Sequence, residues 1–407
     1  WRCACGPALA ADAITLIASL GLAALGLLAT LLAAAGWFSG PAFFFTAVAL
    51  AVLIWPWGQR ALPSDVQPAW ARGLALAALL AVAAALRWPP IPADLGGRDQ
   101  GTYVLRARHT LRTGRLDFTD PVLARAGEAA GQRPGPGDIL GLYPIDSAPE
   151  RAGRYEGAYR PGFYLAERST GAVVPQFLHL HPSLMALFGL VFGPGAIGLL
   201  APLAGVLAVL ALWSLAAQLW PRRPWSWLAA GLFALSPIAV WTHRIPLTES
   251  LYGLFVLAAG LAAARGLRRG DDPGLLVALL LGAAGFVRGN LWLAAPALLA
   301  VAWLRPEPGR RRMSAPTCLV GLLLASLALH LATTYPYLHD EFHRQLGPLA
   351  DLSPLGALLL GAAALAAYLA LDVALAPLRG RLARAPQVLA GLAGLAVLAY
   401  LALRAPG

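Results

Sequence analysis

The sequence is short of charge and contains no lysine. Only 13% of its 407 residues are charged, whereas 58% are hydrophobic. A typical soluble domain carries roughly 25% charged residues, so this balance excludes an ordinary soluble core. All 31 basic residues are arginine, which we interpret as a GC-rich coding bias rather than as a feature of the chemistry.

Cysteine is almost as scarce, and its three positions are uninformative. Cys3, Cys5 and Cys318 form neither a disulfide framework nor a zinc-binding spacing. A phosphate-binding loop, a long internal repeat and a charged low-complexity tail are also missing from the sequence. The first apolar run is too long for a cleavable signal peptide, and we expect it to be a retained membrane span.

Long apolar runs make up most of the sequence. Runs of about 17–25 apolar residues are typical of transmembrane helices. The candidates are residues 8–35, 41–57, 69–87, 195–219, 225–242, 247–266, 273–289, 290–304, 314–335, 354–376 and 386–404. They predict an all-α polytopic membrane protein with about eleven transmembrane helices.

The arginines follow these runs in a regular alternation. A net charge of +11 would suggest nucleic acid in a soluble protein, but in a membrane protein the positive-inside rule explains it more simply. Connections rich in arginine alternate with connections that contain little arginine. All of the arginine-rich connections fall on the cytoplasmic side if the N-terminus is cytoplasmic. The basic connections contain Arg60 and Arg72, Arg222 and Arg223, Arg265 to Arg269, Arg305 to Arg312, and Arg379 to Arg384. We therefore predict a multi-pass protein of the plasma (inner) membrane that does not bind nucleic acid.

One long polar connection interrupts the pattern. Residues 88–178 form a large first extracytoplasmic loop, in which we expect an amphipathic helix at 99–113 bearing Arg106, Arg108 and Arg112. The short apolar segment 177–193 is interpreted as a juxtamembrane or re-entrant helix. The chain then divides into two N-terminal transmembrane helices (1–68), a central part (69–305) and C-terminal transmembrane helices (306–407).

Asp99 stands at the start of that loop helix, close to the membrane. A carboxylate there can act as a general base toward an alcohol or amine, or can bind a metal. The alternative is an acid that opens a helix and satisfies its first backbone amides. His179 and His181, at the end of the loop, can hold phosphate or metal, or can make ordinary interfacial hydrogen bonds.

Four further polar residues fall on the predicted outer face. His243 and Arg244 belong to a turn that follows Ser236-Pro237, and Glu249 opens the next span, where an unpaired acid is costly. Arg288 ends another span, and a guanidinium there suits a lipid phosphate, although it can also anchor on headgroups. A transporter would instead place ionisable residues in mid-span, and the sequence has few: Asp12, His330 and Asp372.

The ordered set of motifs resembles the multispanning GT-C glycosyltransferases, especially the bacterial family 39-like group related to protein O-mannosyltransferases and lipid A aminoarabinose transferases. The matches are Asp99 with Tyr103 in the first outer loop, His181-Pro182 entering an apolar helix, Ser236-Pro237 followed by Arg244 and Glu249, and a Gly-rich span ending at Arg288. They cover about residues 70–305. Two departures are Gln100, where relatives often have a second acid, and two extra spans before the loop.

The resemblance implies a GT-C-like bundle and sugar transfer from a polyprenyl-phosphate-linked donor to a lipid, glycan or protein acceptor, normally with inversion. Asp99 would be the base and Glu249 would orient the acceptor or a neighbouring base. Arg288, with Arg244 or His243, would neutralise the departing prenyl phosphate. The remaining implied substrate contacts are Tyr103, His179 and His181. A divalent metal is compatible with this scheme, although no ligand spacing demands one and no other cofactor is expected.

Two other readings stay open at the level of sequence. A transporter or flippase for lipid-linked glycans would keep the spans but place its essential polar residues near the bilayer midplane. A non-catalytic envelope scaffold would keep the spans and tolerate replacement of Asp99. Polar residues at the rim of the membrane favour the enzyme.

Overall fold

The computed structural model is mostly helical, as expected for a helical membrane protein. It describes residues 6–58, 70–93, 99–131, 157–160, 162–167, 170–221, 224–269, 272–292, 311–335 and 337–338, with a few positions between 355 and 370. The predicted spans at 290–304, 354–376 and 386–404 lie largely outside these residues.

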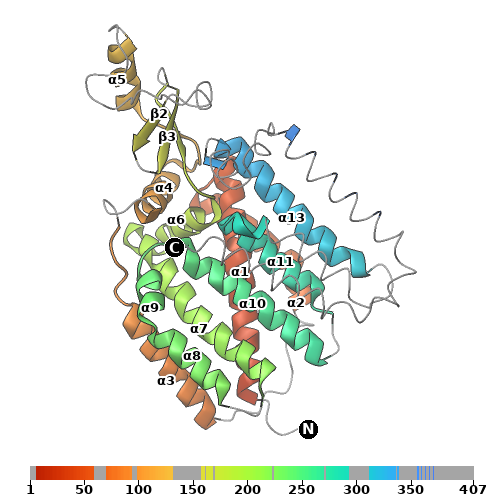
Figure 1. The fold of residues 1–407 in the computed structure, drawn as a ribbon. Coiled ribbons are helices and arrows are strands. Elements are labelled where there is room, and N and C mark those ends of the chain that lie inside the picture. The colour runs from red at the N-terminus through yellow and green to blue at the C-terminus, as the bar shows by residue number, and fades with distance from the viewer. Residues whose placement is uncertain are drawn as a thin grey trace, which may run out of the picture.

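Long helices form a bundle around the N-terminal helix α1. The helices are α1 (Gly6–Ala34), α2 (Gly40–Gly58), α3 (Trp70–Arg87), α7 (Leu200–Leu219), α10 (Thr248–Arg269), α11 (Gly274–Val287) and α13 (Arg311–Thr333). In the described part of the chain, four helical stretches are long and apolar enough to cross a membrane: 10–34, 194–219, 248–269 and 315–333. Figure 1 shows α1 in the middle of the bundle, with α7, α10 and α11 beside it.

Small side chains allow these helices to approach closely. Ala29 of α1, Ala204 and Ala208 of α7 and Ala262 of α10 are all buried in the same core. In lipid, helices gain little from the hydrophobic effect and associate instead through close packing, which small residues favour. The alanine-rich sequence is therefore suited to this packing as well as to the membrane.

The predicted span 225–242 is a bent pair of helices. The chain forms α8 (Trp225–Leu235) and α9 (Pro237–Arg244), which are bent by 58° at Ser236. Pro237 has no backbone N–H and cannot continue the hydrogen-bond ladder of α8. Taken together, the two pieces are a fifth candidate span, and hydropathy alone does not register the break.

The polar elements gather at one end of the bundle. They are α4 (Asp99–Thr113), α5 (Pro121–Gly131) and the strands β1 (Phe118–Thr119), β2 (Gly157–Arg160), β3 (Phe163–Glu167) and β4 (Ala172–Pro175). The strands form an antiparallel sheet in the order β1-β4-β3-β2. The predicted helix at 99–113 is confirmed, whereas the sheet was not expected.

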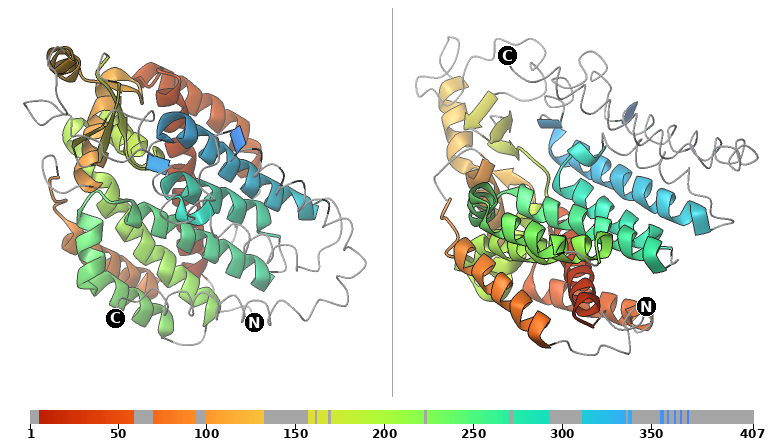
Figure 2. Two further views of the ribbon diagram at one scale, coloured as in Figure 1. Left: turned by 45° about the horizontal axis from the view of Figure 1, so that its top comes forward. Right: turned by 60° about the horizontal axis from the view of Figure 1, so that its bottom comes forward.

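A short apolar helix connects this polar end to the bundle. Helix α6 (Leu180–Phe192) packs on α1 and α4 and is followed by the 3-10 helix η1 (Pro194–Leu199), which leads into α7. Two further views show the strands, α4 and α6 at the same end of the molecule (Figure 2). The bundle thus has a polar cap at one end.

Candidate functional site

A cleft lies where the polar cap meets the helix ends. It encloses about 420 Å³ of empty space, open solvent included. Four residues predicted from the sequence line it: Asp99 and Tyr103 from α4, Glu249 from the start of α10, and Arg288 from the end of α11. The other lining residues are Phe177, Leu178, Leu247, Thr248, Val287, Gly289, Asn290 and Tyr337. Residues nearly 190 positions apart in the chain are thus brought to one cleft.

An ion pair forms one side of this cleft. Arg288 Nη1 donates to Glu249 Oε1 and, at 3.2 Å, to the hydroxyl of Thr248. The two charged side chains are 33% and 46% exposed, so water and salt can reach the pair. Arg288 follows the last residue of α11 in an extended conformation, which turns it away from the helix axis and toward the opening of α10.

Asp99 opens helix α4, and its side chain is exposed at the cleft. An acid in the first turn of a helix is favoured by the exposed N–H groups there. This placement agrees equally well with the helix-opening and the general-base interpretations of the sequence. What distinguishes it from an ordinary helix-opening acid is the cleft beside it.

Three aromatic rings form the wall of the cleft next to Asp99. The rings of Tyr103 and Phe177 are 5.1 Å apart, and those of Phe177 and Tyr337 are 5.2 Å apart. Tyr103 is buried, and burial raises the pKa of its hydroxyl far above the ordinary value, although a hydrogen bond with Thr248 opposes the shift. Tyr103 is therefore neutral and cannot serve as a base near pH 7.

Phe177 has a left-handed backbone, with φ of 70°. For a non-glycine residue this conformation costs about 1–2 kcal/mol. Arg106, which is buried, donates hydrogen bonds from Nη1 to three consecutive carbonyls. These belong to Gln176 at 2.8 Å, Phe177 at 3.1 Å and Leu178 at 3.2 Å. Burial lowers the pKa of Arg106 to about 10, so the guanidinium stays charged at neutral pH.

The predicted substrate contacts at His179 and His181 are not placed in the cleft. Both histidines are buried. His179 Nδ1 contacts Arg106 Nη2, and His179 Nε2 lies 2.6 Å from the hydroxyl of Thr333. Its backbone N–H donates to His330 Nε2 at 3.0 Å, and the two imidazole rings stack. His179 therefore joins the loop to α13.

The protonation of these histidines follows from their surroundings. Burial, together with the neighbouring cation of Arg106, lowers the pKa of His179 well below its ordinary value. Burial lowers the pKa of His181 to about 4, and its ring packs edge-on against Tyr103 at 5.2 Å. Both histidines are neutral near pH 7 and serve the packing behind the aromatic wall.

His243 and Arg244 also lie away from the cleft lining. His243 Nδ1 accepts a 3.0 Å hydrogen bond from the buried Arg87, and its ring packs so closely on α7 that a side chain at Gly205 would meet it at 2.5 Å. Arg244 Nε donates to the carbonyl of Pro89 at 3.0 Å. Their predicted contact with donor phosphate stays a prediction, and in this arrangement both connect α9 to neighbouring chain segments.

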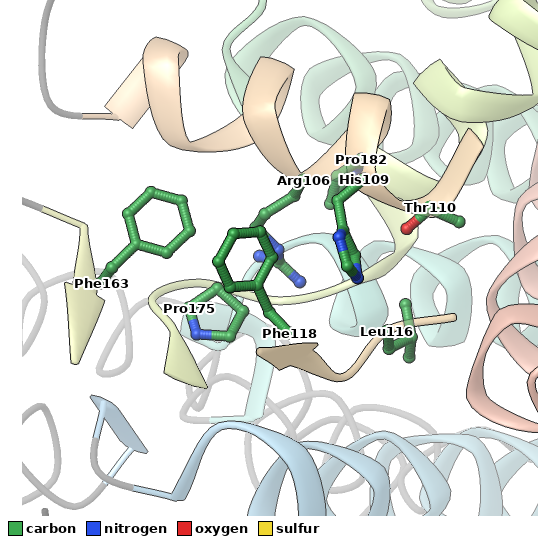
Figure 3. A pocket seen from close by; sticks show the side chains of 8 residues that line it. All are labelled: Arg106, His109, Thr110, Leu116, Phe118, Phe163, Pro175 and Pro182. Atoms are coloured by element: carbon green, nitrogen blue, oxygen red, sulfur yellow. The ribbon is translucent and has the colours of Figure 1, made fainter. Parts of the chain in front are cut away.

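A smaller hollow lies on the other side of Arg106 (Figure 3), between α4 and the sheet. Its lining residues are Arg106, His109, Thr110, Leu116, Phe118, Phe163, Pro175 and Pro182. Figure 3 shows Arg106 and His109 reaching from α4 toward Phe118. His109 Nε2 lies 2.6 Å from the carbonyl of Asp117, so its polar group is already engaged.

The described residues do not gather a set of metal ligands. Among them, no three His, Cys, Asp or Glu side chains come together in the cleft or elsewhere. The cleft offers two carboxylates, Asp99 and Glu249, and the second is already paired with Arg288. This donor set is poorer than the six oxygens that a hard divalent cation prefers.

The sequence missed four residues that shape this site. Thr248, Phe177 and Tyr337 line the cleft, and Arg106 holds the strained loop behind it. The repeated arginines of α4 gave a signal for Arg106, but they looked like a solvated helix face. Comparison with protein-family models, with curated proteins and with solved structures finds no match to this chain.

Proposed function

We propose that this chain is an integral-membrane glycosyltransferase that moves a sugar from a polyprenyl-phosphate-linked donor to an extracytoplasmic lipid, glycan or protein acceptor. One observation carries the proposal: Asp99, Glu249 and Arg288 line a single cleft at the polar end of an apolar helix bundle. Such a cleft offers a base for the acceptor and a cation for the leaving phosphate, next to helices that suit a lipid tail. Inversion is the stereochemistry we propose.

In this proposal the exposed carboxylate of Asp99 accepts the proton of the acceptor hydroxyl or amine as that group attacks the anomeric carbon. Electrons of the broken glycosidic bond pass to the prenyl phosphate, and Arg288 stabilises the charge that grows there. Glu249, paired with Arg288, holds the guanidinium toward the cleft. This modifies the earlier expectation that Glu249 orients the acceptor.

We further propose that about eleven helices cross the plasma (inner) membrane with the cleft on the extracytoplasmic side. Four shorter apolar helices, Gly40–Ala49, Gly73–Arg87, Leu180–Phe192 and Gly274–Val287, accompany the long candidate spans. Arg268 and Arg269 stand in the last turn of α10, the end of that helix opposite its start at Thr248 and Glu249 beside the cleft. That arrangement agrees with the positive-inside rule if the cap faces outward.

Deletion and complementation of the gene test this function. Mass analysis of envelope glycans and prenyl-linked sugars in the deletion strain is expected to show one accumulated donor and one lost glycan. Asp99→Asn should fail to restore the glycan, with transfer reduced by about 10²–10⁴-fold, because the base is removed. Asp117→Asn is the matched control, since this exposed acid pairs with Arg115 outside the cleft lining. Restoration by Asp99→Asn would overturn the base assignment.

A transporter is the second candidate, and one observation favours it. The apolar stretch formed by α8 and α9 is broken at Ser236. Broken helices are a feature of transport sites. Movement of a fluorescent lipid-linked glycan across vesicles by the wild type and by Asp99→Asn alike, with no sugar transferred, would favour this candidate over the enzyme.

A further inference from the structure

Three consecutive carbonyl oxygens converge on one side-chain nitrogen in this structure. The carbonyls of Gln176, Phe177 and Leu178 all accept from Arg106 Nη1, between 2.8 and 3.2 Å. In an extended chain successive carbonyls point in opposite directions, so they reach one donor only where the backbone curls. The left-handed residue Phe177 supplies that curl.

The curled segment is also a wall of the cleft. Phe177 and Leu178 line it, and the ring of Phe177 lies between those of Tyr103 and Tyr337. The strained backbone therefore has a place in the site, since it directs a large ring into the space beside Asp99. Strain of this kind persists only where the surroundings over-determine it.

Arg106 provides those surroundings from the side away from the cleft. It is 6% exposed, its Nη2 contacts His179 Nδ1, and it is absent from the residues that line the cleft. His179 in turn is bound to α13 through Thr333 and His330. The guanidinium thus connects α4, the curled segment and α13 through carbonyls and a neutral imidazole.

We propose that Arg106 is a positioning residue, which holds segment 176–178 in its curled form and so sets the affinity of the cleft for the acceptor. The effect on acceptor affinity rests on the proposed function. The hydrogen bonds by which Arg106 holds segment 176–178, which we call the clamp, do not depend on it. Arg106 touches no reacting group in this scheme. Its loss should disturb the aromatic wall beside Asp99 and leave the Arg288 side of the cleft in place.

Hydrogen exchange of the purified full chain in nanodiscs tests the clamp without any substrate. Two amides report on the segment: Gln176 N–H, which donates to the carbonyl of Gly162 at 2.8 Å, and His179 N–H, which donates to His330. In Arg106→Gln we expect both to exchange about tenfold faster or more, because several hydrogen bonds to a charged group are lost. Amides in α7 and α10 should keep their rates.

Two variants separate the clamp from a general loss of folding. Arg106→Lys keeps a cation with three donors but cannot reach the carbonyls and His179 together, so intermediate exchange is expected. Arg112→Gln removes an exposed arginine from the same helix and should change nothing. Unchanged exchange at Gln176 and His179 in Arg106→Gln, or faster exchange across the whole chain in both Arg106 variants, would overturn the clamp.

The transfer assay then tests the link to the acceptor. In Arg106→Lys we expect the KM for the acceptor to rise about tenfold while the KM for the prenyl-phosphate sugar stays within about twofold. A lower kcat with unchanged acceptor KM would overturn the positioning role. If no variant of the chain transfers sugar, the proposed function fails, and the exchange result still decides the clamp.

Discussion

Arg87 and Arg288 lie at the ends of two different helices of the bundle, α3 and α11, and their environments differ. Arg87, at the end of α3, is fully buried. Its guanidinium donates to His243 Nδ1 at 3.0 Å, to the carbonyls of Ala83 and Ala234 at 3.1 Å, and to that of Phe233 at 3.4 Å. Arg288, at the end of α11, is a third exposed and pairs with a carboxylate at the cleft.

The difference shows which arginine is able to serve a ligand. Every nitrogen of the Arg87 guanidinium is used to satisfy acceptors inside the protein, including carbonyls of α8 close to the break at Ser236. Among the described residues, the side-chain hydrogen bonds of Arg288 are those of Nη1 with Glu249 and Thr248. As far as the described residues go, a phosphate could therefore bind Arg288 without displacing a helix-end contact, whereas binding to Arg87 would expose several buried carbonyls.

Removing the buried arginine should have the largest effect on folding. Arg87→Gln leaves buried carbonyls and His243 without a donor, and we expect the free energy of unfolding to fall by about 3 kcal/mol or more. Thermal unfolding in detergent measures this loss. A variant as stable as the wild type would mean that water or a neighbouring group replaces the guanidinium. That result would contradict the structural role that distinguishes Arg87 from Arg288.

Removing the cleft arginine should affect function instead. In Arg288→Ala, use of the prenyl-phosphate donor should weaken by about 10–100-fold, since a charge-assisted contact to the phosphate is lost. Stability should change by about 1 kcal/mol or less, because partly exposed ion pairs contribute little. Donor and acceptor KM values, measured side by side, check this. If the KM for the donor is unchanged in Arg288→Ala, Arg288 does not bind the donor phosphate and instead anchors on lipid headgroups.

Acid should weaken the buried arginine contacts that depend on neutral histidines. The pKa of His179 is lowered in the folded protein, so the unfolded chain binds more protons once the pH falls below about 6.5. Stability should be level above that pH and should fall on acidification by about 1.4 kcal/mol per unit for each such histidine. The midpoint of thermal unfolding between pH 7.5 and 5 measures the slope. His179→Gln should reduce the slope by the share of one histidine, and an unchanged slope would contradict the assignment.

A change in salt concentration should give the smallest difference between Arg288 and Arg87. The ion pair of Arg288 with Glu249 is open to solvent, and an increase from about 0.1 to 1 M ionic strength shortens the screening length from about 10 to 3 Å. Donor binding at Arg288 should therefore weaken severalfold, while the exchange rate of the Ala234 and Phe233 region around Arg87 should not change. Equal salt sensitivity at both places would show that Arg87 is reached by water.

The positions of most helices could be predicted from the sequence, because apolar length and polar interruptions determine them. Helix α4 was expected at 99–113 and is found there, and α1, α2, α3, α7 and α10 match expected runs within a few residues, apart from the 3-10 turn before α7. The break at Ser236 was missed because proline is frequent in membrane helices and a hydropathy run does not reveal a bend. The sheet was missed because its strands are two to five residues long.

The candidate site was predictable in part for a similar reason. Asp99, Tyr103, Glu249 and Arg288 combine chemistry with a position at a helix end, and these features can be seen along the chain. The buried contacts of Arg106 and His179 could not be predicted, because whether a polar side chain faces solvent or the protein interior depends on what packs against it. His243 and Arg244 looked like site residues because sequence places them near Glu249, whereas the chain turns at Ile245 and directs them elsewhere.

The short helix α11 has a consequence for the thickness of the surrounding membrane. Its 14 residues rise about 21 Å, which is less than the roughly 30 Å of hydrocarbon in a typical bilayer. With one end at the cytoplasmic surface, the other end, and Arg288 with it, would lie below the opposite headgroup layer. A lipid phosphate that meets Arg288 must therefore be drawn inward, or the leaflet must thin there. In the proposed topology, the chain length of the host lipids would therefore control access to the cleft.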